Sequence, residues 1–225
     1  MKPILFLKNY YKNNSKFLIL SILLFFMAIF VFYAITDEIV LEKETNFDDA
    51  VFLFFKNFIV HQHLNETVVA FTKLSSPIFI KVLFPLILVL LLILKKYRQA
   101  IFLFLTGVGG ILLISTFKII FARTRPPYPL LFPETGFSFP SGHATFSFIF
   151  YGALAYLIWL TPLPKFLKLT FMILLVTLSL LIGISRIYLR VHYPSDVLAG
   201  FCLGYSWLLL MIYTSRKWFP LIKAN

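Results

Sequence analysis

The sequence predicts an all-α membrane protein, with six transmembrane helices in one bundle and an amphipathic helical segment in the first outer loop. Of the 225 residues, 60% are hydrophobic and 13% are charged, whereas a soluble domain averages nearer half apolar. Several apolar runs are long enough to cross a hydrocarbon layer of about 30 Å. Because these runs lack the alternation of barrel strands, we expect helices, which satisfy their own backbone hydrogen bonds.

Six apolar runs of this kind follow one another along the chain. They are Phe17–Ile35, Ile78–Leu94, Ala100–Phe121, Ala144–Leu160, Leu169–Ile184 and Val197–Thr214. Lysines precede the first run, as in a signal peptide, but the run is too long for a signal sequence and no small-residue cleavage site follows it. We expect a retained anchor. No repeat or linker divides the chain, so we expect one domain over residues 1–225.

Basic and acidic residues are separated between alternate loops. Twelve of the 21 lysine and arginine residues lie before the first run, after the second, after the fourth or after the sixth. All nine acidic residues lie after the first, third and fifth runs. The positive-inside rule then predicts a plasma-membrane protein with both termini cytoplasmic and the other loops outward. Topology therefore accounts for the net charge of +12 without a nucleic-acid partner.

The first outward loop, from Thr36 to Pro77, contains an amphipathic pattern. Apolar residues recur at helical spacing between Phe47 and Ile59. Asn46 or Asp48 is expected to cap this helix. Two placements remain open: the helix lies along the membrane surface with its aromatic face in lipid, or it packs on the bundle.

Three polar stretches interrupt the outward ends of the last four runs. A charge near the bilayer centre costs roughly 2.5–3.5 kcal/mol on insertion scales, so such residues usually have a function. The candidate site residues in these stretches are Lys118, Arg125, Ser141, Gly142, His143, Arg186, His192 and Asp196.

The composition of these stretches indicates an oxyanion site. Lys118, Arg125 and Arg186 bring three cations to one side of the membrane, and the arginine fork suits two phosphate oxygens. Ser141 and Gly142 stand where the fourth helix begins, so their backbone N–H groups are expected to contribute to anion binding.

The two histidines suit two different roles. His192 stands four residues before Asp196, and a helix that covered both would place them on one face. A carboxylate on one imidazole nitrogen fixes the tautomer and leaves the other nitrogen free to attack. His143 has no local acid, and it suits a general acid that protonates the leaving oxygen.

The same stretches argue against metal catalysis, because they are rich in cations and poor in carboxylates. His61 and His63 form a possible exception, but two ligands are too few for a site. We therefore expect neither a metal nor a cofactor.

These three stretches resemble the tripartite signature of the type-2 phosphatidic acid phosphatase family. That signature is Lys-x6-Arg-Pro, then Pro-Ser-Gly-His, then Ser-Arg-x5-His-x3-Asp, and the chain matches every fixed position from Lys118 to Asp196. The resemblance implies a membrane lipid phosphatase that forms a phosphohistidine on His192, with Asp196 as its partner. It implies that His143 acts first as the acid and then as the base that activates water. The remaining five site residues would hold the phosphoryl group.

The resemblance also suggests bacterial lipid phosphates as substrates. Undecaprenyl pyrophosphate and phosphatidylglycerophosphate are favoured over phosphatidic acid and a lipid A phosphate. A lipid phosphotransferase that uses the same intermediate is the alternative. A transporter of anionic lipids is disfavoured, because the sequence shows neither inverted repeats nor paired broken helices. Nothing in the sequence indicates an oligomeric state.

A few further residues have structural interpretations. Gly107, Gly109 and Gly110 are expected to permit close helix packing. Arg123 either adds to the basic mouth of the site or is a solvated flanking charge. Cys202 is expected to be a small hydrophobe, and one cysteine allows no disulfide framework.

Overall fold

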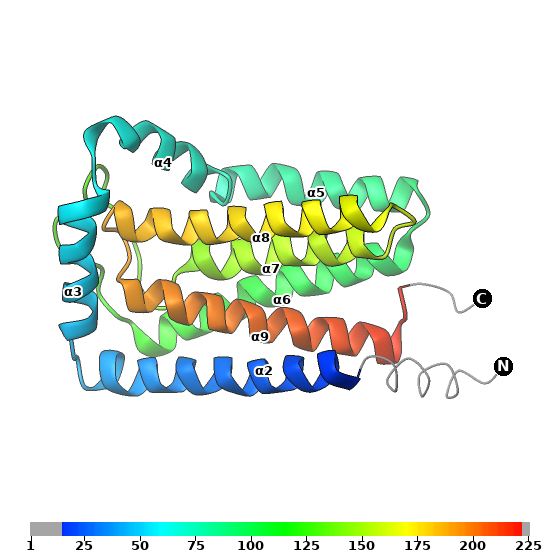
Figure 1. The fold of residues 1–225 in the computed structure, drawn as a ribbon, viewed down its shortest axis with the longest axis horizontal. Helices are drawn as coiled ribbons and strands as arrows, with labels where there is room; N and C mark the ends of the chain where they lie inside the picture. Colours follow the sequence, from blue (N-terminus) through cyan, green and yellow to red (C-terminus); the bar gives the residue numbers. More distant parts are fainter. Residues whose placement is uncertain (1–14, 222–225) are drawn as a thin grey trace.

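Six long helices form the body of the protein in the computed structural model, which describes residues 15–221 (Figure 1). Each contains one predicted apolar run to within one residue. These helices are α2 (Ser15–Ile35), α5 (Pro77–Ile93), α6 (Tyr97–Phe121), α7 (Gly142–Trp159), α8 (Lys165–Tyr188) and α9 (Pro194–Trp218). The described residues contain no strand, so the all-helical prediction is confirmed.

Four stretches in the described part of the chain are long and apolar enough to cross a membrane: Ile19–Ile39, Tyr97–Phe121, Lys165–Tyr188 and Pro194–Trp218. A fifth crossing results if a bent pair, residues 62–73 and 77–93, counts as one broken span. The helix α7 is not among these candidates. Length and composition therefore support four or five of the six predicted spans.

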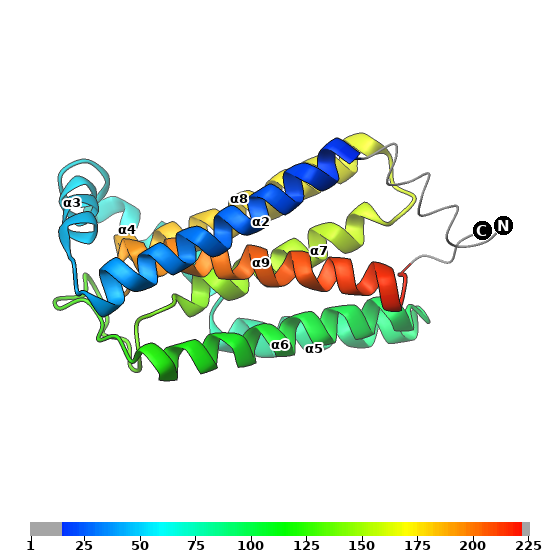
Figure 2. The same cartoon turned by 90° about the horizontal axis from the view of Figure 1, so that it is seen from below.

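The helix α7 lies at the centre of the bundle and packs against α6, α8 and α9 (Figures 1 and 2). Its side chains Ile149, Phe150 and Ala153 are fully buried. A polar contact joins it to α8, where the hydroxyl oxygens of Ser147 and Ser179 lie 3.2 Å apart. Small polar residues of this kind allow helices to approach closely in a membrane. The helix that begins with the Pro-Ser-Gly-His stretch is thus held on three sides.

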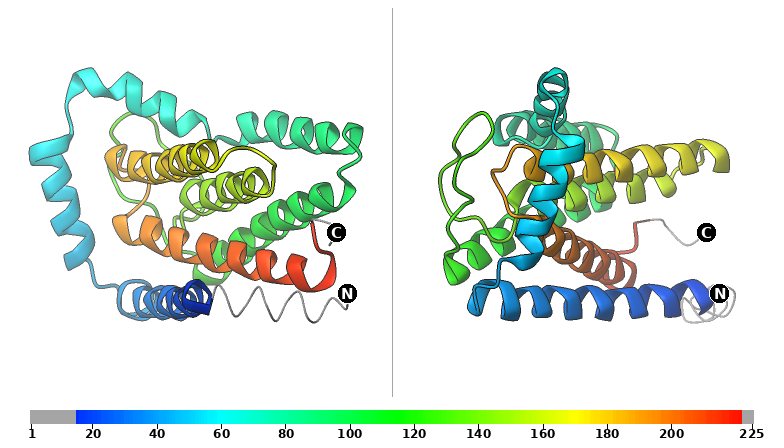
Figure 3. Two further views of the ribbon diagram at one scale, coloured as in Figure 1. Left: turned by 45° about the vertical axis from the view of Figure 1, so that its right-hand side comes forward. Right: turned by 60° about the vertical axis from the view of Figure 1, so that its left-hand side comes forward.

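One end of the bundle carries α3 (Asn46–Phe54), which crosses it between α2 and α4 (Asn65–Lys73) (Figures 1 and 3). We call this end the site end. The helix α2 continues into a π-helical segment, Thr36–Leu41, and α3 continues into another, Phe55–Ile59, before a short 3-10 turn at Gln62–Leu64.

The amphipathic segment packs one face on the bundle and exposes the other, and its placement in lipid stays a prediction. Phe52 is buried against α7, α8 and α9, whereas Phe54 and Phe58 are exposed. The predicted cap is wrong. Thr45 occupies the N-cap position without a side-chain hydrogen bond, and Asp48 is fully buried because its carboxylate is bonded within the site.

The helix α4 was not predicted from the sequence, and it changes the start of α5. It packs on α8, and a 40° bend separates it from α5. As a result α5 begins partway along the bundle rather than at its end (Figure 1). Two contacts fix this break: the Tyr151 hydroxyl donates to the Leu74 carbonyl at 2.7 Å, and the Ser76 hydroxyl accepts from the Phe79 N–H at 3.3 Å.

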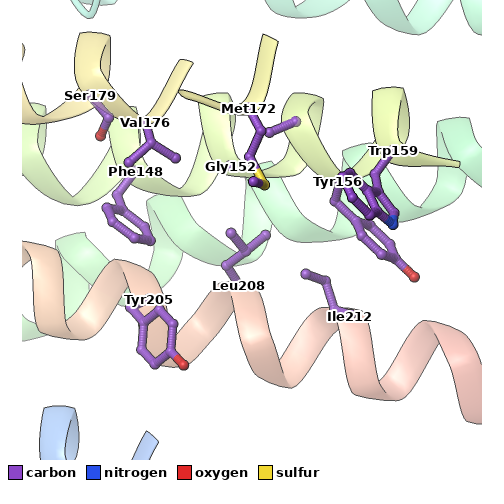
Figure 4. A pocket seen from close by; sticks show the side chains of 11 residues that line it. Phe148, Gly152, Tyr156, Trp159, Met172, Val176, Ser179, Tyr205, Leu208 and Ile212 are labelled. Carbon is purple, nitrogen blue, oxygen red and sulfur yellow. The ribbon is translucent and has the colours of Figure 1, made fainter. Parts of the chain in front are cut away.

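Towards the opposite end, an apolar pocket lies between α7, α8 and α9 (Figure 4). It has a volume of about 360 Å³, and Phe148, Tyr156, Met172 and Leu208 are among its lining residues. No acidic or basic side chain lines it. This pocket therefore offers packing space for apolar groups and no catalytic chemistry.

The glycines of α6 allow its neighbours to approach closely, as predicted. A Cβ added at Gly107 would lie 2.3 Å from Phe84 of α5, one at Gly109 would lie 2.3 Å from Trp207 of α9, and one at Gly110 would lie 2.7 Å from Ile149 of α7. Each distance is far shorter than an ordinary contact between carbon atoms.

We predict that Gly109→Ala lowers the thermal stability of the detergent-solubilised protein, because the new methyl group displaces Trp207. Overpacking of this kind costs about 1–3 kcal/mol, and each kcal/mol corresponds to about 2–4 °C at this chain length. Leu112→Ala, at an exposed position of the same helix, is the control. Equal melting temperatures for the two variants would contradict this packing.

Candidate active site

The three polar stretches meet at the site end of the bundle. The helix α6 ends where Ala122 adopts a left-handed backbone with φ of 44°, a conformation that commonly terminates helices. The chain that follows folds back on itself, since the Ser138 N–H donates to the Arg123 carbonyl at 2.8 Å. The Ser141 N–H donates to the Asp196 carbonyl at 3.0 Å. These bonds bring the start of α7 against the start of α9.

Asp196 is the centre of the hydrogen-bond network and is fully buried. Its Oδ2 accepts from the Tyr193 N–H at 2.9 Å and, in a short bond, from the Ser138 hydroxyl. Its Oδ1 accepts from Arg123 Nη1 at 2.7 Å. Asp196 stands in the first turn of α9, so its carboxylate also caps that helix.

His192 precedes α9, so the expected helix does not cover both members of the pair. Pro194 begins the helix, and the cap formed by Asp196 brings the two side chains together. His192 Nδ1 lies 3.4 Å from Asp196 Oδ2 and 3.4 Å from the Ser138 hydroxyl. On the other side of the ring, Nε2 lies 3.2 Å from Arg125 Nη1. The carboxylate therefore favours the tautomer with the proton on Nδ1 and leaves the Nε2 lone pair facing Arg125.

Burial sets the protonation state of His192. Removal of the ring from water lowers its pKa to about 4, against the opposing effect of the Asp196 carboxylate, which raises the pKa. Arg125 and Arg186 lower this pKa further. The imidazole is therefore neutral at neutral pH, which is the state that a nucleophile requires.

Two arginines bind one carboxylate beside the histidine. Glu134 lies 3.3 Å from Arg125 Nη1 and forms a short ion pair with Arg186 Nη2. Burial raises the pKa of Glu134, but Arg186, His143 and Arg125 together outweigh that effect and the pKa falls to about 2. Arg186 also donates to the Thr72 hydroxyl at 2.7 Å. The two guanidinium groups thus form a seat for an anion with several oxygens.

Three more predicted residues, Lys118, Ser141 and Gly142, lie where α6 ends and α7 begins. Lys118 Nζ donates to the carbonyl of Phe137 in a short bond and lies 3.5 Å from that of Ser138. Ser141 is the N-cap of α7, where its hydroxyl accepts from the Ala144 N–H at 3.4 Å. A Cβ at Gly142 would lie 3.7 Å from the Lys118 side chain.

A second carboxylate network, which the sequence did not predict, lies behind His192 and Asp196, the predicted catalytic pair. Arg123 bridges Asp196 at 2.7 Å and Asp48 at 2.8 Å. Asp48 also accepts from the N–H and the hydroxyl of Ser195, at 2.8 and 2.7 Å. Arg123 is only 11% exposed, so it is not a solvated flanking charge. This network ties α3 to the first turn of α9.

Candidate metal ligands are sparse in the part of the chain that the structure describes. No group of three or more His, Cys, Asp or Glu side chains there is placed to hold a metal ion. The rings of His61 and His63 stack at 5.6 Å. The carboxylates of Asp48 and Asp196 are both paired with Arg123.

Comparisons with known proteins place this arrangement in a family. The sequence profile of the PAP2 superfamily matches residues 98–220, which is more than half of the chain. The chain belongs to the PAP2 superfamily. The matched PAP2 region contains every predicted site residue, from Lys118 to Asp196.

Several curated PAP2 relatives are similar to this chain. It is 36% identical to phosphatidylglycerophosphatase B of Bacillus subtilis over 146 residues, which cover 63% of this chain and 70% of the relative. It is 35% identical to undecaprenyl-diphosphatase of Sulfolobus acidocaldarius over 143 residues, which cover 60% of this chain and 65% of the relative. It is 32% identical to lipid A 1-phosphatase of Rhizobium etli over 124 residues, which cover 50% of this chain and 49% of the relative.

The fold is also similar to a solved PAP2 structure. The crystal structure of a transmembrane PAP2-type phosphatidylglycerolphosphate phosphatase from Bacillus subtilis superposes with a TM-score of 0.73 at 29% identity, and the match covers 89% of this chain and 98% of that one. With the apolar helices described above, this similarity identifies the chain as a membrane protein.

We predict that Asp48→Asn lowers kcat about tenfold, because a neutral amide holds Arg123 and Ser195 less firmly and the catalytic pair shifts. The variant is assayed by phosphate release in detergent. Asp49→Asn, at the exposed neighbouring position in the same helical turn, is the matched control and retains the wild-type rate. Identical rates for the two variants would show that α3 does not position the site.

We predict that the His192 ring titrates near pH 4, so that it is protonated below that pH and neutral above it. Nuclear magnetic resonance of histidine-labelled protein in detergent measures this midpoint, and His192→Gln identifies the signal. A midpoint near the ordinary value of about 6.5 would mean that burial does not control the charge of this ring.

Proposed function

We propose that this chain is an integral membrane lipid phosphatase that hydrolyses a phosphomonoester or a pyrophosphate through a phosphohistidine intermediate. The observation that carries the proposal is the position of His192. Its neutral ring is held by Asp196 on one side, and its Nε2 lies 3.2 Å from a guanidinium that also faces an anion seat. The names of the PAP2 relatives, which include two kinds of lipid phosphatase, support this assignment.

In the first step, His192 Nε2 attacks phosphorus in line with the leaving oxygen. The N–P bond forms as the P–O bond to the lipid breaks, and His143 donates a proton to the leaving oxygen. Asp196 stabilises the positive charge that develops on the imidazole, which is how a buried carboxylate assists a histidine. The first product is a lipid that has lost its terminal phosphate group.

In the second step, His143 takes a proton from water, and the oxygen of that water attacks phosphorus. The N–P bond breaks, inorganic phosphate leaves, and both histidines return to their starting states. The site contributes position and charge throughout, as is general for phosphoryl transfer.

The cations stabilise the phosphoryl oxygens in both steps. Arg125 and Arg186 face one seat. Arg186 Nε is buried and has no hydrogen-bond partner among the described residues, so it is a donor available to a phosphate oxygen. Lys118, the Ser141 hydroxyl and the N–H group at Gly142 complete the phosphate-binding site in this proposal. A phosphate that enters the seat competes with the Glu134 carboxylate.

The charge balance of the site supports a reaction without a metal. Two-metal phosphatases gather carboxylates around their ions, whereas here Asp48 and Asp196 are both paired with Arg123. Three further cations surround the anion seat. Added metal ions would meet repulsion there, so the arginines and the lysine take the role of the Lewis acid.

We further infer one domain with six spans and an outward-facing site. The central α7 joins the five candidate spans as the sixth. The end opposite the site carries Lys95 and Lys96 in the turn before α6, Arg98 at the start of α6, and Lys165 and Lys168 at the start of α8. These basic residues support a cytoplasmic location for that end. Four other lysines in this prediction, Lys2, Lys8, Lys12 and Lys223, lie outside the described residues.

The proposed substrate is a lipid whose phosphate reaches the site end while its chains stay among the helices. Phosphatidylglycerophosphate and undecaprenyl pyrophosphate remain the favoured candidates, and they correspond to the substrates in the names of two relatives. A lipid phosphotransferase would share the first step and pass the phosphoryl group to a second lipid. Product analysis with a labelled acceptor lipid distinguishes it from a hydrolase.

We predict that purified protein in detergent releases inorganic phosphate from at least one lipid phosphate in the presence of EDTA, and that His192→Ala abolishes this release. The lipids are undecaprenyl pyrophosphate, phosphatidylglycerophosphate, phosphatidic acid and a lipid A phosphate. Asp196→Asn is expected to lower the rate while some activity remains. Loss of wild-type release with EDTA, or normal turnover by His192→Ala, would overturn the mechanism.

A further inference from the structure

Lys81 is a charged residue in an otherwise apolar helix. It lies in α5 four residues after Pro77, or about 6 Å along the axis. Because α5 begins partway along the bundle (Figure 1), Lys81 lies well below the site end. A charge at such a depth is costly, and intramembrane lysines usually face a partner or a functional cavity.

The residues that the structure describes supply no counterion for Lys81. No hydrogen bond or ion pair holds its ammonium group among the described residues, and its side chain is exposed. No acidic residue occurs between Glu66 and Glu134 in the sequence, and α7 contains none either. The helices on each side of Lys81 therefore present no carboxylate to it.

The cavity beside Lys81 also reaches the proposed general acid. This cavity has a volume of about 350 Å³ and is lined by residues of α5, α6 and α7, with Lys81, Gly142 and His143 among them. Most of the other lining side chains are apolar. The Ser75 hydroxyl donates to the His143 carbonyl at 3.4 Å, so the break before α5 is anchored to the start of α7. Lys81 and His143 thus border one space of fixed geometry.

The proposed role of His143 indicates which part of the substrate occupies this cavity. An acid that protonates the leaving oxygen lies on the leaving-group side of the scissile bond. The leaving group is the lipid, so the part of the lipid next to that oxygen occupies the cavity with Lys81. A lysine there favours a leaving group that itself carries a negative charge.

We propose that Lys81 binds a second phosphate group of the substrate, the one that stays on the lipid, and thereby selects lipids with two phosphorus groups over lipid monophosphates. The inference rests on the proposed phosphatase function. Two sources share this chemistry: the inner phosphate of a lipid diphosphate and the phosphodiester of phosphatidylglycerophosphate. Phosphatidic acid has one phosphorus group and leaves Lys81 without a partner.

The test compares kcat/KM for undecaprenyl pyrophosphate, phosphatidylglycerophosphate and phosphatidic acid. Lys81→Met keeps the length of the side chain and removes its charge. For this variant, the ratio of kcat/KM for a two-phosphorus lipid to that for phosphatidic acid falls about tenfold, mainly through KM, as expected for one charged contact. Lys81→Arg restores the ratio. Lys73→Met, at an exposed lysine of α4, leaves it unchanged.

The outcomes separate the two proposals. If Lys81→Met lowers the kcat/KM ratio for only one of the two lipids with two phosphorus groups, the result supports the inference and identifies the source of the second phosphate. If wild type hydrolyses the lipids but Lys81→Met leaves every ratio unchanged, or lowers all three rates equally, the role of Lys81 is refuted while the phosphatase function stands. If wild type hydrolyses none of them, both proposals fail. Melting temperatures measured on the same samples show that Lys81→Met is folded.

Discussion

The buried carboxylate of Asp196 is the interaction on which the rest of the site depends. A carboxylate without exposure to water is tolerated only when it is paired and hydrogen-bonded. Here Arg123 neutralises it, while Ser138, His192 and the backbone of Tyr193 lie around its other oxygen. Through these contacts a single group caps α9, orients the histidine ring and draws in the loop after α6.

The same requirement explains why a polar site can exist within a helical membrane bundle. Two buried arginines of the site have partners on other elements: Arg123 pairs with Asp48 of α3, and Arg186 with Glu134 of the loop before α7. The crossing helix α3 and the broken pair α4–α5 therefore do more than connect spans. They supply Asp48 and Thr72 to the site, and a cavity lined by α5, α6 and α7 reaches His143.

The sequence predicted the six long helices and the three polar stretches that meet at the site end, because both have local signals. Apolar runs are contiguous, and the three polar stretches each fit within a dozen residues. The sequence did not predict the role of Asp48 in the site. Asp48 bonds to Arg123, 75 positions away, and to Ser195, 147 positions away, and no local sequence pattern indicates such a contact. The short helix α4 was missed because its mixed polar and apolar residues show no long period. The prediction that Asp48 caps α3 was wrong because its carboxylate bonds to Arg123 and Ser195 instead of to the first turn of the helix.

Trapping of the covalent intermediate tests the central claim most directly. Protein mixed with a lipid labelled in its terminal phosphate is quenched in base, digested and mapped by mass spectrometry. The account predicts an acid-labile, base-stable phosphate on His192 that is absent from His192→Gln and accumulates in His143→Gln, where water is no longer activated. Label on another residue, or hydrolysis with no labelled protein in either the wild type or His143→Gln, would contradict the mechanism.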